Sequence, residues 1–134
     1  MIVQCINNET SNFSTETKKY INDYIHLSKV SLIIGKKYIV YGLLFRKGVP
    51  WYYICEEDSD EYPLPHFCGF FKVINPKLSS EWEINYLEEE RIVVSILPSI
   101  WSNVANFYEN LVNGNENETS MFQNIKSVID SNEE

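Results

Sequence analysis

Between residues 31 and 97 the sequence is a series of short segments rich in β-branched and aromatic residues, separated by turn residues. The segments are SLIIGKKYIVYGLLF, WYYIC, FFKVI, EWEINYL and RIVVSIL, and RKGVP between the first two is typical of a hairpin turn. Gly35 is expected at a turn and Gly42 at a bend or bulge. Strands this short and closely spaced predict an antiparallel sheet that is strongly bent or closed into a small barrel.

Helical periodicity flanks this β region on both sides. Apolar residues recur at helical spacing from Phe13 to Ile25, and Ser14 or Thr15 can cap the first turn, so we expect an amphipathic helix over about residues 14–27. A short first strand at residues 3–6 precedes it. Beyond residue 98, apolar stripes over residues 101–111 and 121–129 predict one or two C-terminal helices, with a loop at residues 115–119. Strands in series between helices define an α+β protein, expected as one domain over residues 1–134.

The charge of the chain limits its partners. Its 134 residues carry a formal net charge of -8, from 19 acidic against 11 basic residues. Nucleic acids and anionic membranes bind clustered positive charge, so neither is expected as a partner. No apolar run reaches the ~18 residues that span a bilayer, and the N-terminus lacks the features of a signal peptide, which favours a cytoplasmic location. Three cysteines without tight spacing are expected to stay reduced.

The most distinctive segment is PWYYICEEDSDEYPLPHFCGFF, residues 50–71, where carboxylates crowd into a short stretch. They belong to Glu56, Glu57, Asp58, Asp60 and Glu61. The segment lacks the glycine and the distant glutamate of a calcium loop, so no metal is expected here. Adjacent carboxylates repel one another and are costly to bury, which favours a solvated loop or hairpin.

Enzymatic chemistry has little support in the sequence. There is no G-x-S-x-G motif and no glycine-rich phosphate loop, and no cofactor is expected. His66 and Cys68 lie two residues apart, a spacing that shares one face of a strand, so a small hydrolase using this pair is an alternative. Because no third residue is identified to orient them, we expect a protein that is not an enzyme.

Aromatic residues adjoin the carboxylates. Aromatic side chains can anchor a protein partner while carboxylates accelerate the encounter with a basic surface, so Tyr62, Trp51 and Tyr52 are candidate anchors. Alternation places Trp51 and Tyr53 on one face of a strand and Tyr52 and Ile54 on the other. Both faces are apolar, so one is core and the other is covered by a helix or by something else. The competing interpretation packs Trp51 and Tyr53 inside, with the acids only solvating a turn.

A family resemblance covers residues 32–82. The stretch LIIGKKYIVYGLLF…GVPWYYICEEDSDEYPLPHFCGFFKVINPKLSSEW has a strand-Gly-Lys-x-Tyr opening, an aromatic strand, acidic residues, a proline-marked turn and a late Leu-Ser-x-x-Trp. This pattern resembles small bacterial immunity proteins with an SH3-like barrel, encoded beside secreted or contact-dependent toxins. The resemblance implies an SH3-like core and a cytoplasmic immunity protein that binds and neutralises a cognate toxin domain.

The acidic charge favours a particular kind of toxin. Secreted nucleases are commonly basic, because they hold a phosphate backbone, so an acidic protein can cover such a cleft. We expect the carboxylates of residues 56–61 to make the electrostatic contact, and the acidic group Glu88–Glu90 to extend it if the fold brings the two turns together. The alternative function is a non-catalytic SH3-like adaptor or regulator that holds a peptide or protein partner on Trp51 and Tyr53.

Overall fold

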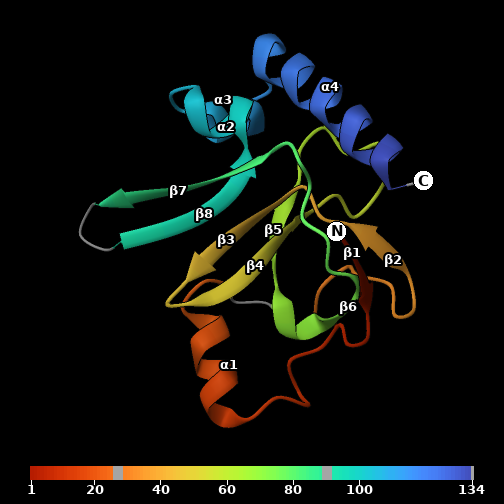
Figure 1. Cartoon of the computed structure of the whole chain (residues 1–134). Helices are drawn as coiled ribbons and strands as arrows, with labels where there is room; N and C mark the ends of the chain where they lie inside the picture. The colour runs from red at the N-terminus through yellow and green to blue at the C-terminus, as the bar shows by residue number, and fades with distance from the viewer. Residues whose placement is uncertain (26–28, 89–91, 134) are drawn as a thin grey trace.

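The computed structural model describes residues 1–25, 29–88 and 92–133, whose strands form two antiparallel sheets (Figure 1). The smaller sheet has the order β2-β1-β6, with β1 Ile2–Cys5, β2 Lys37–Ile39 and β6 Phe71–Asn75. The larger has the order β5-β4-β3-β8-β7, with β3 Gly42–Arg46, β4 Val49–Ile54, β5 Leu64–Phe67, β7 Trp82–Glu88 and β8 Ile92–Pro98. The helices are α1 Thr15–Asn22, α2 Ser99–Asn103, α3 Phe107–Val112 and α4 Glu116–Asn132, and Cys68–Phe70 is a 3-10 turn, η1.

The α+β class expected from the sequence is confirmed, but the described strands do not close into a barrel. The segment predicted as continuous β structure is divided instead, because the chain leaves the smaller sheet after Ile39 and enters the larger one at Gly42. The bend expected at Gly42 falls at this crossing. A Cβ atom on Gly42 would lie 2.6 Å from Cδ2 of buried Leu97 and 3.4 Å from the carbonyl oxygen of Ile96, so any larger residue would force Leu97 to move.

Two hairpins build the centre of the larger sheet, as the sequence predicts. The turn between β3 and β4 consists of Lys47 and Gly48, which have φ angles of 52° and 79°. Positive φ at both central residues is the geometry of a two-residue turn that matches the twist of the strands. The next hairpin pairs Ile54 with Leu64, so the acidic segment is the loop that joins β4 to β5.

One face of β4 is covered by helices. Trp51 is fully buried, and its Nε1–H donates to the hydroxyl of Tyr20 in α1 at 2.8 Å. Further along the same face, the ring of Tyr53 lies 4.7 Å from that of Trp101 in α2. Figure 1 shows α1 at one end of the larger sheet and the C-terminal helices at the other. The interpretation that Trp51 and Tyr53 pack inside is therefore the correct one.

The opposite face of β4 is covered by the smaller sheet. Tyr52 is 7% exposed, and its ring centroid lies 5.7 Å from that of Phe71 in β6. Since Trp51 and Tyr52 are both buried, the prediction that they anchor a partner at the surface is wrong in this fold. The physical reason is that β4 is an inner strand, which lies between β3 and β5 and has packed layers on both faces.

The N-terminal helix begins where the sequence predicts and ends earlier. Ser14 caps α1, and its hydroxyl oxygen accepts a hydrogen bond from the Thr17 N–H at 3.1 Å. The helix ends at Asn22 rather than near residue 27, and residues 26–28 of the predicted span lie outside the described ranges. Ile21 is fully buried and fixes this short helix on the core.

The C-terminal region contains three helices, where one or two were expected. The apolar stripe over residues 101–111 is divided between α2 and α3 because Asn106 adopts a left-handed conformation, with φ of 56°. α4 starts at Glu116, inside the segment predicted to be a loop, and buries Phe122 and Ile129. Its end lies near the start of the chain, where the Met1 amino group pairs with the Glu133 carboxylate. Among the described residues, none of the helices has the length and apolar character needed to cross a bilayer.

Candidate functional site

The loop between β4 and β5 presents its carboxylates to solvent. Glu57, Asp58 and Glu61 are exposed, whereas Glu56 and Asp60 are half-buried. Within the described part of the chain, no lysine or arginine side chain forms an ion pair with any of these carboxylates. In this segment, defined here as the acidic loop over residues 56–61, the exposed carboxylates of Glu57, Asp58 and Glu61 are therefore available to a partner.

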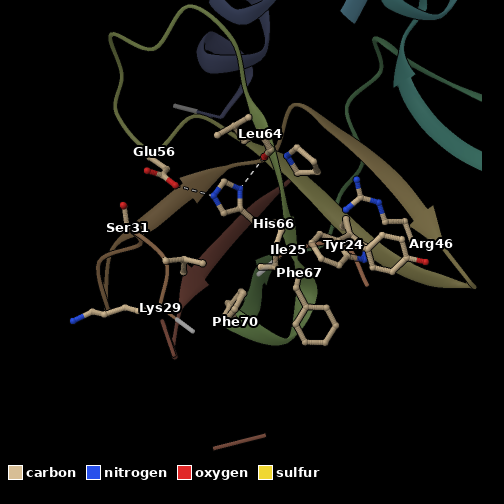
Figure 2. Close-up of a pocket in the computed structure, with 13 residues that line it drawn as sticks. Tyr24, Ile25, Lys29, Ser31, Arg46, Glu56, Leu64, His66, Phe67 and Phe70 are labelled. Atoms are coloured by element: carbon tan, nitrogen blue, oxygen red, sulfur yellow. Dashed lines mark hydrogen bonds and ion pairs between the residues drawn. The ribbon is translucent and has the colours of Figure 1, made fainter. Parts of the chain in front are cut away.

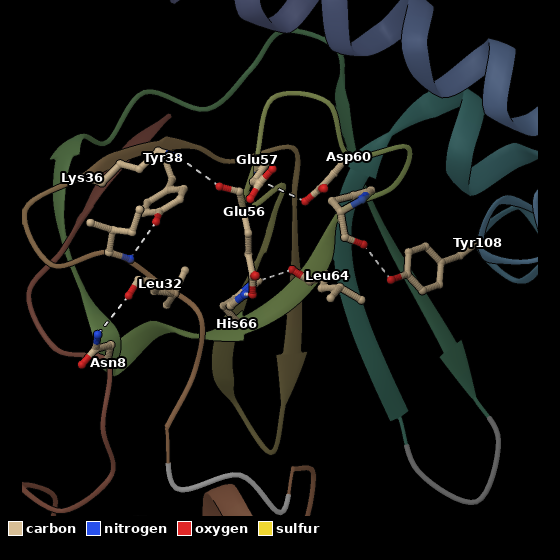
Figure 3. A network of polar contacts seen from close by, with 12 residues as sticks. Asn8, Leu32, Lys36, Tyr38, Glu56, Glu57, Asp60, Leu64, His66 and Tyr108 are labelled. Carbon is tan, nitrogen blue, oxygen red and sulfur yellow. Dashed lines mark hydrogen bonds and ion pairs between the residues drawn. The ribbon is translucent and has the colours of Figure 1, made fainter.

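The acidic loop is held in shape by its own hydrogen bonds (Figure 3). The Asp60 carboxylate accepts from the Glu57 N–H at 3.1 Å, while the Asp60 N–H donates to the Glu57 carbonyl at 3.0 Å. The Tyr108 hydroxyl donates to the Pro63 carbonyl at 2.7 Å and ties the end of the loop to α3. At its start, the Lys36 ammonium donates to the Glu56 carbonyl at 3.1 Å.

A histidine and a carboxylate that the sequence analysis did not pair are in contact at the base of this loop. Nε2 of His66 lies 3.1 Å from Oε1 of Glu56, and Nδ1 of His66 lies 2.8 Å from the Leu64 carbonyl oxygen. The hydrogen bond from His66 lowers the pKa of the Glu56 carboxyl below its ordinary value of 4.5, against the opposing effect of burial. The β4–β5 register places Tyr52 opposite His66, and Glu56 reaches His66 from the loop beyond β4, so the pair is not visible before the path of that loop is known.

The two partners of His66 are both hydrogen-bond acceptors. A carbonyl oxygen and an ionised carboxylate both accept hydrogen bonds and neither donates one. When each ring nitrogen carries a proton, His66 donates to both acceptors at once, and its contact with Glu56 is then an ion pair. His66 is 6% exposed but the Glu56 side chain is 28% exposed, so solvent screens the contact between them.

The alternative hydrolase pair is not assembled. Both ring nitrogens of His66 are engaged by Glu56 and Leu64, and no hydrogen bond joins His66 to Cys68 in the described residues. Burial raises the pKa of the Cys68 thiol, which disfavours the nucleophilic thiolate. Nor do three or more His, Cys, Asp or Glu side chains gather as a metal site within the described ranges.

A pocket of about 330 Å³ lies beside the acidic loop (Figure 2). Glu56 belongs to both, and the pocket continues from Leu64 at the start of β5 across His66 to Phe67, Phe70 and Tyr24. Most of this lining is apolar, and the size is at the lower end of the range for ligand pockets. The Arg46 guanidinium forms the far wall, 4.7 Å from the centre of the Tyr24 ring and 4.5 Å from that of Trp51. The arrangement suits a bulky apolar group, with Glu56 at one side of the pocket and the cationic side chains of Lys29 and Arg46 elsewhere in its lining.

The remaining predicted site residues differ in how exposed the structure leaves them and in whether it describes them. Tyr62 is half-buried and packs against the C-terminal helices, so part of it stays accessible. Leu64, which the sequence analysis did not single out, is 46% exposed at the edge of the pocket. In the group Glu88–Glu90, residues 89 and 90 lie outside the described ranges, and the extension of the acidic surface stays a prediction.

Comparisons with known proteins give no relative from which a function could be transferred. A scan against family models and searches of curated proteins and solved structures find no match for this chain.

Proposed function

We propose that this chain is a non-catalytic binding protein that neutralises a basic toxin domain, with a nuclease as the favoured class. The observation that carries the proposal is the acidic loop, whose exposed carboxylates at Glu57, Asp58 and Glu61 have no lysine or arginine partner in the described residues. Clustered charge of this kind steers a partner of opposite sign and raises the rate of association.

The stiffness of the acidic loop adds to this support. The paired bonds between Glu57 and Asp60, the Glu56–His66 contact and the Tyr108–Pro63 bond hold the loop before any partner arrives. A loop that is already ordered loses less conformational entropy on binding, so more of the interaction energy contributes to affinity. The Tyr108–Pro63 and Glu56–His66 contacts join the loop to distant residues, which a turn that only solvates charge does not need.

The pocket supplies the apolar contact that Trp51 and Tyr52 cannot. In the proposed complex, an apolar side chain of the toxin enters beside Leu64 while basic side chains around it meet the acidic loop. Central apolar anchors surrounded by charged residues are the usual arrangement of tight interfaces. The adaptor alternative, in which a peptide lies on Trp51 and Tyr53, loses support because both are buried in the core.

The immunity class itself rests on the resemblance over residues 32–82. Within that stretch, β3, β4 and β5 follow one another as an antiparallel meander, which is compatible with an opened form of an SH3-like core. We take this meander as the counterpart of the family's barrel, with the acidic loop as the binding element.

The test reverses charge where no structural bond is lost. Glu57→Lys, Asp58→Lys and Glu61→Lys are combined, and association with an inactive variant of any basic toxin domain found encoded beside this chain is measured by stopped flow at two salt concentrations. We expect association to slow by about tenfold or more and its salt dependence to fall. Asp58→Lys alone is compared with Glu83→Lys, the matched single reversal, since Glu83 is an exposed acid on β7, the far edge of the sheet. An unchanged rate in the triple variant, or an equal loss in the control, refutes the steering role.

A further inference from the structure

The outer strand of the larger sheet carries the most exposed apolar side chains of the described residues. On β7, Ile84 is 75% exposed and Tyr86 is 64% exposed. Both lie on the same face of the sheet as half-buried Phe45, Val94 and Ile96. Ile84 and these three residues line a hollow of about 250 Å³. No described strand pairs with the free side of β7 (Figure 1). An open edge flanked by apolar side chains is a surface on which another strand can add.

The backbone of β7 presents hydrogen-bonding groups to this free side. The Ser99 N–H donates to the Glu81 carbonyl at 3.1 Å, and Trp82 faces Pro98, which has no N–H. Because antiparallel pairing alternates, odd-numbered residues of β7 bond to β8 and even-numbered residues point outward. The N–H of Tyr86 accordingly donates to its neighbour Asn85 at 2.9 Å rather than to β8. Ile84, at the centre, directs both its N–H and its C=O outward.

We propose that β7 pairs with β7 of a second copy of this chain, antiparallel about a two-fold axis at Ile84. In this register Ile84 lies opposite Ile84, and the two exchange a pair of backbone hydrogen bonds. Trp82 lies opposite Tyr86 on the apolar face. On the other face, Glu83 lies opposite Asn85, whose amide can donate to the carboxylate.

The sequence of β7 is self-complementary in this register, which is why a second copy is the occupant. Aromatic residues meet across the strands and no glutamate faces a glutamate, whereas a two-fold axis at Glu83 would place two carboxylates together. The two apolar faces join into one across the new sheet. Pairing also frees Asn85 from the Tyr86 N–H, which then becomes a donor to the Trp82 carbonyl of the other copy.

The dimer is expected to be weak and strengthened by salt. Pairing over so few residues buries less than the ~1,000 Å² of a stable interface, so association is expected only at about 0.1–1 mM protein. Each copy also carries a formal charge of -8, and their repulsion is screened as ionic strength rises. This salt response is opposite in sign to that proposed for the acidic loop, so the two surfaces are distinguishable and independent.

Sedimentation equilibrium of the full chain, from about 10 µM to 1 mM, tests the proposal. The wild-type mass is expected to rise toward twice that of one chain, more steeply at higher salt. Ile84→Pro removes both central N–H donors, and proline is tolerated on a strand edge where the N–H faces solvent, so a folded monomer is expected at every concentration. Ile84→Val keeps the donors and most of the apolar surface, and should still dimerise.

Each result decides the question. A wild-type protein that stays monomeric at 1 mM overturns the proposal, as does a folded Ile84→Pro variant that dimerises equally well. If Ile84→Pro fails to fold, amide exchange of wild-type Ile84 decides instead: protection that grows with protein concentration supports the pairing, and concentration-independent exchange overturns it. A monomeric wild type whose toxin binding is lost in Ile84→Pro would assign this edge to the partner rather than to a second copy.

Discussion

β4 and β7 are both aromatic strands of the same sheet, and they lie in opposite environments. The last four residues of β4, from Trp51 to Ile54, are all buried, whereas β7 leaves Ile84 and Tyr86 largely exposed. The cause is position, because β4 is an inner strand covered on both faces and β7 is an edge strand. Burial therefore depends on what the rest of the chain places over a strand. The stability of the protein should depend on β4, and β7 should be free for contacts.

The largest loss of unfolding free energy is expected from Trp51→Ala. It removes a fully buried ring that contacts Tyr20, Tyr24 and Phe67, and a substitution of this kind costs about 3–5 kcal/mol of unfolding free energy. Urea unfolding followed by far-UV circular dichroism measures it. Trp82→Ala on β7 is the matched control, and its half-buried ring should cost clearly less. Equal losses would contradict the difference between the strands.

A smaller loss of unfolding free energy is expected from Tyr20→Phe, which removes one hydroxyl group that packs against β4. That hydroxyl accepts from Nε1 of Trp51 at 2.8 Å and donates to the Arg46 carbonyl at 2.8 Å. Its loss leaves a buried indole N–H without a partner, at a cost of about 1–2 kcal/mol. Tyr86→Phe on β7 should leave the urea midpoint unchanged, because Tyr86 is mostly exposed. A Tyr20→Phe midpoint equal to that of wild type would show that the bond contributes nothing.

Features determined by neighbouring residues were predictable from the sequence. The Lys47–Gly48 turn, the Ser14 cap and the hairpin loop of acids each follow from local chemistry. Features determined by distant residues were not. The close approach of Leu97 to Gly42 joins residues far apart in the sequence, and the Glu56–His66 pair depends on the path of the loop after β4. The burial of Trp51 and Tyr52 likewise needs α1 and β6 in place, so two predicted anchors became core residues.

From the Glu56–His66 pair, which lies between the core and the acidic loop, we expect a contribution to the unfolding free energy that is lost in acid. Because the pKa of Glu56 is lowered in the folded state, the pair stabilises the fold above the ordinary value of 4.5, and this contribution is lost as pH falls through the lowered pKa. Glu56 is partly exposed, so the effect is expected to be below about 1 kcal/mol.

Urea midpoints of wild type and Glu56→Gln, measured from pH 7 to pH 3, test this contribution. A glutamine side chain can donate to Nε2 of His66 or accept from it, so the variant should fold, and without the Glu56 carboxyl it should lose less stability on acidification than wild type. Glu57→Gln is the matched control, since the Glu57 carboxylate is exposed, and it should follow the wild-type profile. Identical profiles for all three proteins would show that the Glu56–His66 contact does not contribute to the unfolding free energy.

The smallest effect is expected from Ile84→Ala on β7, measured at about 5 µM so that only single chains are present. Ile84 is 75% exposed, and truncation there should change the unfolding free energy by no more than about 0.5 kcal/mol. The same truncation on β4, Ile54→Ala, removes a side chain that is 1% exposed and should cost about 2–5 kcal/mol. Because the chemical change is identical, the ratio of the two losses measures burial alone. A cost at Ile84 approaching that at Ile54 would mean that this edge is covered in the folded chain, and neither strand pairing nor any other contact could then use it.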